Sequence, residues 1–300
     1  MCAVEQSLFQ RVLTFVADHL MSVESLANIP ELIGEQIFVC ALRRRAFEEP
    51  ARADRCLELF ASVYHGAVLR SLCLRDCLLV INEYTEPIVT LSRHLVHLDL
   101  GCCHLGDGHE MVAAIAQFVS LQTLNLRENG LTDVGVRRLT LPCRMLGRGP
   151  LLLRELDLSG NAGIADKSAV SLACFTQLRQ VNLSCTSVTP GGVSRLCSSL
   201  GLRASREGPW LGHPTATIGW AATLLDQWRG CMEDAASKRR HKRLMLSPPK
   251  TGIFSYRKRV KLGSPSLSPL GPSGTLVLGP PRSPPAVAPR PSPTSKRRLF

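Results

Sequence analysis

Leucines recur along this chain in the order L-x-x-L-x-L, which appears first as LRSLCL from Leu69. Four further copies begin at Leu95, Leu121, Leu153 and Leu178, so that successive copies are offset by 26, 26, 32 and 25 residues. The last copy has Val181 in place of its second leucine. Within each copy apolar residues alternate with other residues, which is the period of a strand buried on one side. The pattern therefore predicts five short parallel strands, one in each copy of a repeated unit.

Each copy continues into a turn and then into a helix. The ninth residues are expected to point inward and to satisfy buried backbone groups; they are Cys77, Cys103, Asn129, Asn161 and Thr186. Segments such as TDVGV from Thr132 place Thr or Asp at an N-cap, after which the apolar period changes to about 3.6 residues. The insertion RMLGRGP accounts for the one spacing of 32 residues. These features predict an α/β fold, a leucine-rich repeat solenoid of about five repeats.

Residues 1–66 precede the repeats and are predicted to form a helical leader. Their apolar residues recur at helical spacing, Pro30 stands near a helix start, and Pro50 is expected to break the chain before the apolar pattern of DRCLELFASVY. The first repeat of a solenoid needs a cover over its open apolar end. One role for the leader is therefore an N-terminal cap.

The leader also carries two short motifs that suggest a partner. SLFQRVLTFV from Ser7 resembles an elongin-C-binding box, although Val12 stands where a cysteine is usual, and IPELIGEQIF resembles the cullin box that follows it. The matching residues are Leu8, Val12, Val16, Ile29, Pro30 and Ile33. Together the motifs are similar to the von Hippel–Lindau-type box of leucine-rich repeat substrate receptors of ubiquitin ligases, which implies elongin C and a cullin as partners. The same residues also suit the core of a cap, so both roles stay open.

Residues 94–110 contain four histidines and two adjacent cysteines, which are residue types that bind zinc or perform thiol chemistry. They are His94, His97, Cys102, Cys103, His104 and His109. In the repeat register His97 faces outward and Cys103 inward, so these side chains diverge instead of meeting at one metal ion. We expect neither a metal site nor a Cys–His catalytic site here, and Cys103 is expected to be structural.

Residues 67–231 are predicted to form the repeat domain, capped at its C-terminal end by an amphipathic helix that contains Trp220 and Trp228. Residues 232–300 hold 15 of the 36 Lys and Arg but 2 of the 24 Asp and Glu, together with 12 of the 20 prolines. The chain's net charge of +12 therefore comes from this segment. It can bury little apolar surface, and we predict a disordered, basic, Pro- and Ser-rich tail.

The tail carries three kinds of short motif. The first is a basic cluster of the nuclear-localisation type, formed by Lys238, Arg239, Arg240, Lys242 and Arg243; the alternative is a solvated linker. The second is a set of Ser-Pro sites for cyclin-dependent kinases at Ser247, Ser264, Ser268, Ser283 and Ser292. The third is a C-terminal KRRLF that resembles a cyclin-docking motif through Arg297, Leu299 and Phe300. These motifs imply importin and a cyclin-dependent kinase as partners and a nuclear, or nuclear and cytoplasmic, location, with only non-specific attraction to nucleic acid.

The outward residues of the strands are expected to form a concave face that binds a protein partner. They are His97, Asp99, Asn125, Arg127, Glu155, Asp157, Gln180 and Asn182, with Arg75 continuing the row. The chain has no G-x-x-x-x-G-K, G-x-S-x-G or H-E-x-x-H sequence, so we predict a protein that is not an enzyme and needs no cofactor. No apolar run approaches the roughly 18 residues of a membrane helix, and no signal peptide is recognisable.

The order of the helical leader, LDLGCCHLGD, LRENGLTDVGVRRLT, LDLSGNAGIAD and GWA…QW resembles the leucine-rich repeat-containing protein 42 family over about residues 7–230. This resemblance implies a repeat fold without enzymatic activity. Three functions remain open: a nuclear adaptor that binds through the concave face, a substrate receptor of an elongin–cullin ubiquitin ligase, and nucleic-acid association through the tail.

Overall fold

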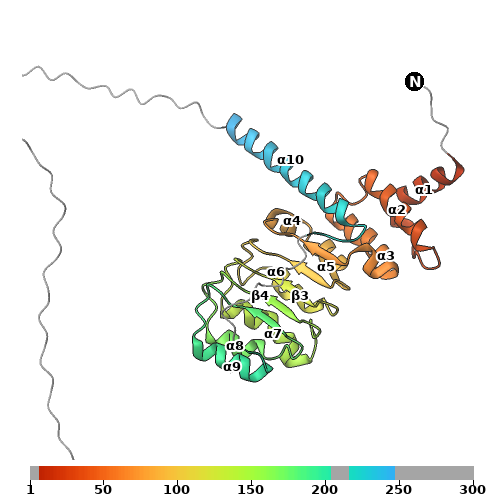
Figure 1. The fold of residues 1–300 in the computed structure, drawn as a ribbon. Coiled ribbons are helices and arrows are strands. Elements are labelled where there is room, and N and C mark those ends of the chain that lie inside the picture. The colour runs from red at the N-terminus through yellow and green to blue at the C-terminus, as the bar shows by residue number, and fades with distance from the viewer. Residues whose placement is uncertain (1–6, 204–215, 247–300) are drawn as a thin grey trace, which may run out of the picture. The chain divides into compact units, whose positions relative to one another are not determined.

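The computed structural model describes residues 7–203 and 216–246, with 240–246 as backbone only. Within them lies a parallel sheet of five short strands in sequence order (Figure 1). The strands are β1 (Ser71–Cys73), β2 (His97–Asp99), β3 (Thr123–Asn125), β4 (Glu155–Asp157) and β5 (Gln180–Asn182). Their central residues are paired in register from Leu72 to Val181. The predicted strands and the repeat fold are confirmed.

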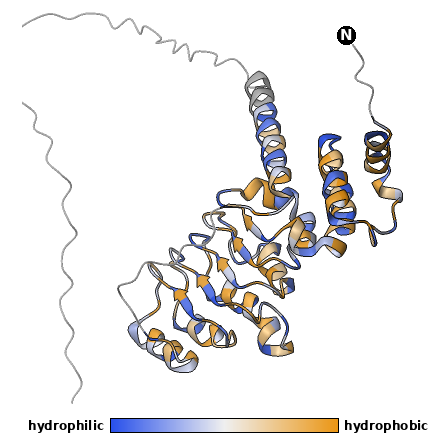
Figure 2. Ribbon diagram, turned by 45° about the vertical axis from the view of Figure 1, so that its right-hand side comes forward, coloured by the Kyte–Doolittle hydropathy of each residue, from blue (hydrophilic) through white to orange (hydrophobic). Residues whose placement is uncertain are grey.

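The repeated leucines form the core between the sheet and a layer of helices. The central leucines of β1 to β4 are at most 2% exposed. The helices of this layer are α4 (Leu78–Glu83), α5 (Thr85–Ser92), α6 (Glu110–Ala114), the short 3₁₀ helix η2 (Ile115–Gln117), α7 (Asp133–Leu146), α8 (Asp166–Leu172) and α9 (Pro190–Leu200). Figure 2 colours the strands part orange and part blue, because each central apolar residue lies between more polar ones. The alternation along the strands therefore turns the leucines toward the helices, as the leucine spacing indicates.

Three of the five ninth residues join a repeat to the one before it. Each donates a hydrogen bond to the carbonyl of the leucine that follows the preceding strand: Cys103 to Leu74 at 3.0 Å, Asn129 to Leu100 at 2.8 Å and Asn161 to Leu126 at 2.9 Å. All three side chains are fully buried. These bonds satisfy carbonyl groups that water cannot reach, which confirms the structural role predicted for Cys103, Asn129 and Asn161. The other two ninth residues, Cys77 and Thr186, are half-buried and bond to carbonyls of their own repeats instead.

A second series of contacts joins the repeats at their helix N-termini. Asp107, Asp133 and Asp166 each accept a hydrogen bond from a backbone N–H of the next repeat, at 2.8–2.9 Å. The N-cap residue of α8, Ala165, has no side-chain acceptor, and Asp133 of the preceding repeat takes its place. The expectation that each repeat caps its own helix is therefore wrong for α8. In the fifth repeat Pro190 replaces the aspartate, so the series ends there.

The leader consists of α1 (Leu8–Asp18), the 3₁₀ helix η1 (Leu20–Ser22), α2 (Glu31–Arg43) and α3 (Pro50–Val68). Pro30 is the N-cap residue of α2, as the sequence predicts, whereas Pro50 is already the first residue of α3 and not a break before it. Helix α3 packs against α5 of the first repeat. Phe38, Phe47 and Phe60 form a buried aromatic cluster with ring centroids 5.1–6.4 Å apart. Helices α2 and α3 thus supply an apolar cover next to the first repeat.

The segment after the fifth repeat returns to the first one. The backbone N–H of Ile218 donates to the carbonyl of Ser71 at 2.9 Å, along the outer edge of β1. Trp228 is fully buried, stacks on Tyr84 with ring centroids 4.3 Å apart and donates to the carbonyl of Phe47 at 2.7 Å. The prediction that this segment caps the C-terminal end of the repeats is therefore wrong. An amphipathic pattern reveals an apolar face but not the surface that the face covers.

Helix α10 (Ala222–Leu246) continues past the domain boundary predicted at 231. Residues 232–246 are therefore helical, and the prediction that disorder begins at 232 is wrong for them. Their Ala, Met, Glu, Lys and Arg residues favour a helix, and the first proline after Trp228 is Pro248. Among the described helices, none is long and apolar enough to cross a membrane.

Candidate protein-interaction site

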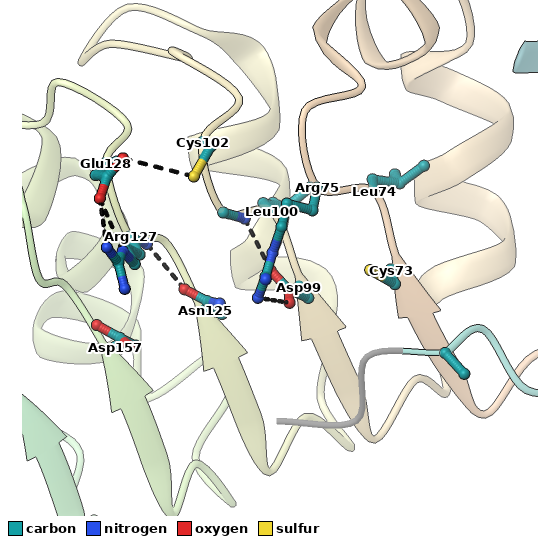
Figure 3. A network of polar contacts seen from close by, with 12 residues as sticks. Cys73, Leu74, Arg75, Asp99, Leu100, Cys102, Asn125, Arg127, Glu128 and Asp157 are labelled. Carbon is teal, nitrogen blue, oxygen red and sulfur yellow. Dashed lines mark hydrogen bonds and ion pairs between the residues drawn. The ribbon is translucent and has the colours of Figure 1, made fainter. Parts of the chain in front are cut away.

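Polar residues of β2 to β5 form a row across the sheet: Asp99, Asn125, Asp157 and Asn182 (Figure 3). Each side chain accepts, through Oδ1, a hydrogen bond from the backbone N–H two residues further on, at 2.8–3.1 Å. This is the geometry of an Asx turn, which bends the chain at the end of a strand. Asp99, Asn125 and Asp157 are at most 4% exposed, so the prediction of an exposed row is wrong for these three.

Carboxylates and amides alternate along this row. Two carboxylates directly opposite each other on neighbouring strands would repel, whereas an amide can donate to a carboxylate. Asn182 donates through Nδ2 to Asp157 Oδ2 at 3.2 Å. At the other end Arg75 donates through Nη2 to Asp99 Oδ2 at 2.8 Å, and the Asp99 carboxylate raises the pKa of Arg75. The row is thus held together largely by bonds within the protein.

The first residues of β2 to β5 form a second outward row, which consists of His97, Thr123, Glu155 and Gln180. His97, Glu155 and Gln180 are half-buried, while Thr123 between them is buried. His97 Nδ1 is buried with no hydrogen-bond partner among the described residues, and burial lowers the pKa of this imidazole. Two further residues predicted for the concave face lie outside this second row. Asn182 is half-buried, and Arg127 is exposed.

Exposed charges on this side of the sheet lie in the loops that follow the strands. Arg127 pairs with Glu128 at 2.6 Å, and the two side chains are 55% and 45% exposed (Figure 3). Arg75 is 45% exposed despite its bond to Asp99. Of the predicted concave-face residues, Arg75 and Arg127 are therefore the ones that reach solvent as charges.

The His/Cys run of residues 94–110 is divided among separate environments. His104 is exposed, whereas His109 is the N-cap of α6 and accepts from the backbone N–H of Met111 at 3.0 Å. His94 lies against His65, with ring centroids 4.5 Å apart. Cys102 lies 3.7 Å from a Glu128 carboxylate oxygen. Within the described residues no three His, Cys, Asp or Glu side chains gather as they would around a metal ion.

The buried thiols are not poised for nucleophilic chemistry. Burial raises the pKa of Cys103 to about 12, and burial together with the neighbouring Cys143 raises that of Cys174 to about 12. Nucleophilic attack needs the thiolate, and these two groups are protonated at neutral pH.

The first helix of the leader exposes a stripe of large apolar side chains. Leu8, Val12 and Phe15 are 77%, 51% and 64% exposed, and their spacing of four and three residues places them on one side of α1. We call these three residues the α1 stripe. Ser7 fixes the start of the helix through a capping box with Gln10, with both hydrogen bonds at 3.3 Å. Phe15 was not among the predicted box residues, although its position seven residues after Leu8 indicates it.

The remaining predicted box residues lie deeper. Val16 is half-buried and packs on the core from the other side of α1. Ile29 and Ile33 are also half-buried against the core, while Pro30 is exposed at the start of α2. Leu32, which the motif does not include, is 66% exposed. The structure therefore divides the box into a core part and an exposed part that contains Leu8 and Val12.

The basic cluster lies on the distal part of α10. Lys238 and Arg239 are exposed, and Arg240, Lys242 and Arg243 belong to the part described as backbone only. The predicted phosphorylation and cyclin-docking residues lie outside the described residues: Ser247, Ser264, Ser268, Ser283, Ser292, Arg297, Leu299 and Phe300.

Comparisons with known proteins agree with this architecture. The leucine-rich repeat family model matches residues 91–108, 119–139 and 151–173. Leucine-rich repeat-containing protein 42 of Homo sapiens is 35% identical over 272 residues, which cover 88% of this chain and 62% of that protein. The Xenopus laevis protein is 36% identical over 229 residues (74% and 55%), and the Danio rerio protein 38% over 229 residues (74% and 56%).

The chain thus spans roughly three fifths of the length of the curated relatives it matches. Leucine-rich repeat domains are protein-interaction modules and are in general not enzymes. Since these relatives are 34–38% identical to it over 74–88% of its length, we conclude that the chain belongs to the leucine-rich repeat-containing protein 42 family.

Proposed function

We propose that the chain is a non-enzymatic adaptor that docks onto elongin C through the α1 stripe and holds a second protein on its repeats. In this role it acts as a substrate receptor of an elongin–cullin ubiquitin ligase. The observation that carries the proposal is the exposure of Leu8, at 77%, at the start of a capped helix that is folded against α2.

Two features of the leader support a docking role beyond that of a cap. The side of α1 opposite the stripe already packs inward through Leu13, Val16 and Ala17, so the stripe is not needed for the core. A short helix with apolar anchors at positions i, i+4 and i+7 is the form in which proteins bind a groove of a partner.

The cullin-box residues support a second contact less directly. Pro30 and Leu32 are exposed at the start of α2, which packs against α1. We propose that this end of α2 faces the cullin, while Ile29 and Ile33 keep the helix in place.

The repeats are proposed to bind the second protein on the loop side of the strand row. Arg75, Arg127 and Glu128 supply exposed charge there, and His97, Glu155, Gln180 and Asn182 supply half-buried polar groups. Asp99, Asn125 and Asp157 contribute indirectly, because their hydrogen bonds to backbone N–H groups fix the loops that follow β2 to β4.

Affinity purification from cells tests the ligase role. The wild-type chain should enrich elongin C and a cullin, and Leu8→Ser should lose both. The matched control is Leu79→Ser, because Leu79 on α4 is also a well-exposed leucine, at 57%, and lies outside the leader. Equal enrichment by the wild type and by Leu8→Ser would contradict the proposal.

We also propose nuclear import through the basic cluster, since Lys238 and Arg239 are exposed on α10. Replacing Lys238, Arg239, Arg240, Lys242 and Arg243 by alanine in a fluorescent fusion should move the protein to the cytoplasm. An unchanged nuclear signal would contradict this proposal.

Phosphorylation at the Ser-Pro sites and docking through Arg297, Leu299 and Phe300 remain proposals about residues outside those described. Deleting Arg297–Phe300 should slow phosphorylation by a purified cyclin–kinase pair, and an unchanged rate would contradict the docking motif.

A further inference from the structure

The longest helix of the repeats, α7, exposes a face in which arginines and large apolar residues alternate. Val136, Leu139 and Cys143 point into the core. On the opposite face Leu141 and Met145 are 43% and 71% exposed. Arg137, Arg138 and Arg144 are exposed at the helical spacings that place them on this same face.

The loop after α7 adds further exposed arginine and apolar side chains at the C-terminal end of this helix. Gly147, at φ +59°, and Arg148 end the helix, with N–H bonds from Gly147 to the carbonyl of Cys143 and from Arg148 to that of Pro142. The chain then folds back, so that a Cβ built on Gly149 would lie 3.9 Å from the Cβ of Cys143. Leu146, Leu151 and Leu152 are left 67%, 42% and 50% exposed. We call Arg137, Leu141, Arg144, Met145, Arg148 and Leu152 the α7–loop surface.

Exposed large apolar residues are concentrated here, as they also are on α1. Five of the sixteen exposed large apolar residues in the described part of the chain fall between positions 141 and 152. The stretch coincides with the insertion that lengthens this repeat to 32 residues, so the other repeats have no counterpart of it. Exposed apolar groups gathered in this way mark contact sites more often than isolated ones do.

The charge of the surface selects its occupant. Three of the six residues of the α7–loop surface are arginines and none is acidic, and these three arginines form no ion pair within the described residues. Arginine pairs with carboxylates through two parallel hydrogen bonds, while leucine and methionine side chains accept apolar anchors. We infer that the α7–loop surface binds an acidic amphipathic segment of a partner protein, one with leucine or phenylalanine on one side and carboxylates on the other.

Other occupants fit the surface less well. The chain's own residues 232–300 carry 15 Lys and Arg against 2 Asp and Glu, so they repel it. A second copy docked face to face would place arginines against arginines. Residues 134–154 contain no aromatic residue and no lysine, whereas helices that lie on membranes are typically rich in both.

Binding of synthetic probes to the full chain tests the inference. The acidic probe is a labelled helical peptide with leucine and phenylalanine on one face and glutamate on the other. The basic probe carries lysine in place of each glutamate. Vesicles of phosphatidylserine and phosphatidylcholine represent an anionic membrane.

The acidic probe should bind the wild type, and Arg144→Glu should weaken it by about tenfold, the scale of one charge-assisted hydrogen bond. Arg55→Glu is the matched control, because Arg55 is an exposed arginine of α3 outside this surface, and it should leave binding unchanged. Leu152→Ser in the loop provides a second variant that does not alter a helix.

Three results would overturn the inference. They are equal binding of the acidic probe by the wild type and Arg144→Glu, equal binding of the two probes, and binding to the vesicles in preference to the acidic probe. Failure of the acidic probe to bind the folded wild type would also overturn it. Since the surface lies outside the leader, these results are independent of elongin C binding.

Discussion

The backbone N–H of Ile218 donates to the carbonyl of Ser71 at 2.9 Å, so the segment that follows the fifth repeat lies beside the first strand. This contact covers the outer edge of β1, which would otherwise present unpaired backbone groups to other chains. The same segment brings Trp228 into the core between Tyr84 and Phe47. The N-terminal end of the solenoid is therefore closed by two segments from opposite ends of the described chain.

Gly219 makes this return possible. Its φ is +132°, and a Cβ at this position would overlap the backbone of Val68 and Leu69. Gly219→Ala should therefore destabilise the chain by about 1–3 kcal/mol or more, the usual range for backbone strain. Urea unfolding followed by tryptophan fluorescence measures the change.

Gly230 provides the matched control. It lies within α10, and a Cβ there meets nothing within 4 Å. Gly230→Ala should stabilise the chain by about 0.5–1 kcal/mol through helix propensity. Equal stability of the two alanine variants would show that the close approach of Gly219 to Val68 and Leu69 has no energetic consequence, which is the opposite of the expected result.

The aspartates that join neighbouring repeats should contribute like helix caps. Asp133 accepts from the backbone N–H groups of Ala165 and Ser168 at 2.9 and 3.2 Å and from the Ser168 hydroxyl. Burial opposes its ionisation, but these bonds outweigh burial and lower its pKa. Asp133→Ala should cost about 1–2 kcal/mol of unfolding free energy.

Asp226→Ala is the control for that substitution, because Asp226 is 75% exposed and pairs only with Arg229 among the described residues. A surface pair of this kind contributes between about 0 and 1 kcal/mol. Similar losses for the two variants in thermal unfolding would show that the inter-repeat contact adds nothing.

Stability should fall as the solution is acidified from pH 7 to 5. Burial, the largest cause in each case, lowers the pKa of His94, His97 and His109 in the folded chain. Since an unfolded histidine has a pKa of about 6.5, the unfolded chain binds more protons just below that pH. The contribution of these histidines to stability is therefore fully present above about pH 6.5, and it is lost as the pH falls toward the pKa values that they have in the folded chain.

Melting temperatures of the wild type and His97→Gln between pH 5 and 8 measure this effect. The variant should show the smaller dependence on pH. The carboxylates with lowered pKa values, Asp133, Asp166 and Glu128, lose their contributions only around and below about pH 4, so they do not mask it. Identical slopes would rule out His97 as a contributor.

The repeat core was predictable from the sequence because strand geometry leaves little choice. A period of two assigns Leu98 to the core and Asp99 to the opposite side, and Asn129 is placed by its fixed distance from the preceding leucine. Neither assignment requires knowledge of distant parts of the chain.

The burial of Asp99, Asn125 and Asp157 does not follow from the strand period, because the period gives the side of the sheet that a side chain occupies but not the hydrogen bonds that it makes. The sequence does contain a signal, since Asp or Asn precedes a loop residue by two positions in four successive repeats, as in Asp99 and Gly101. That spacing is typical of Asx turns, in which the Asp or Asn side chain accepts a hydrogen bond from the backbone N–H two residues further on. The return of α10 to the first repeat has no such signal, because the apolar face of Trp228 fits either end of a solenoid.

The proposed docking helix depends on Leu8 as its anchor. Isothermal titration of the purified 300-residue chain with purified elongin C measures this contribution, with Leu8→Ser and Leu79→Ser as the paired variants. Burial of a leucine contributes about 1.5–3 kcal/mol, so Leu8→Ser should weaken binding by roughly tenfold to a hundredfold. Leu79→Ser should bind like the wild type. Absence of binding by the folded wild type, or equal affinities for the wild type and Leu8→Ser, would contradict the claim.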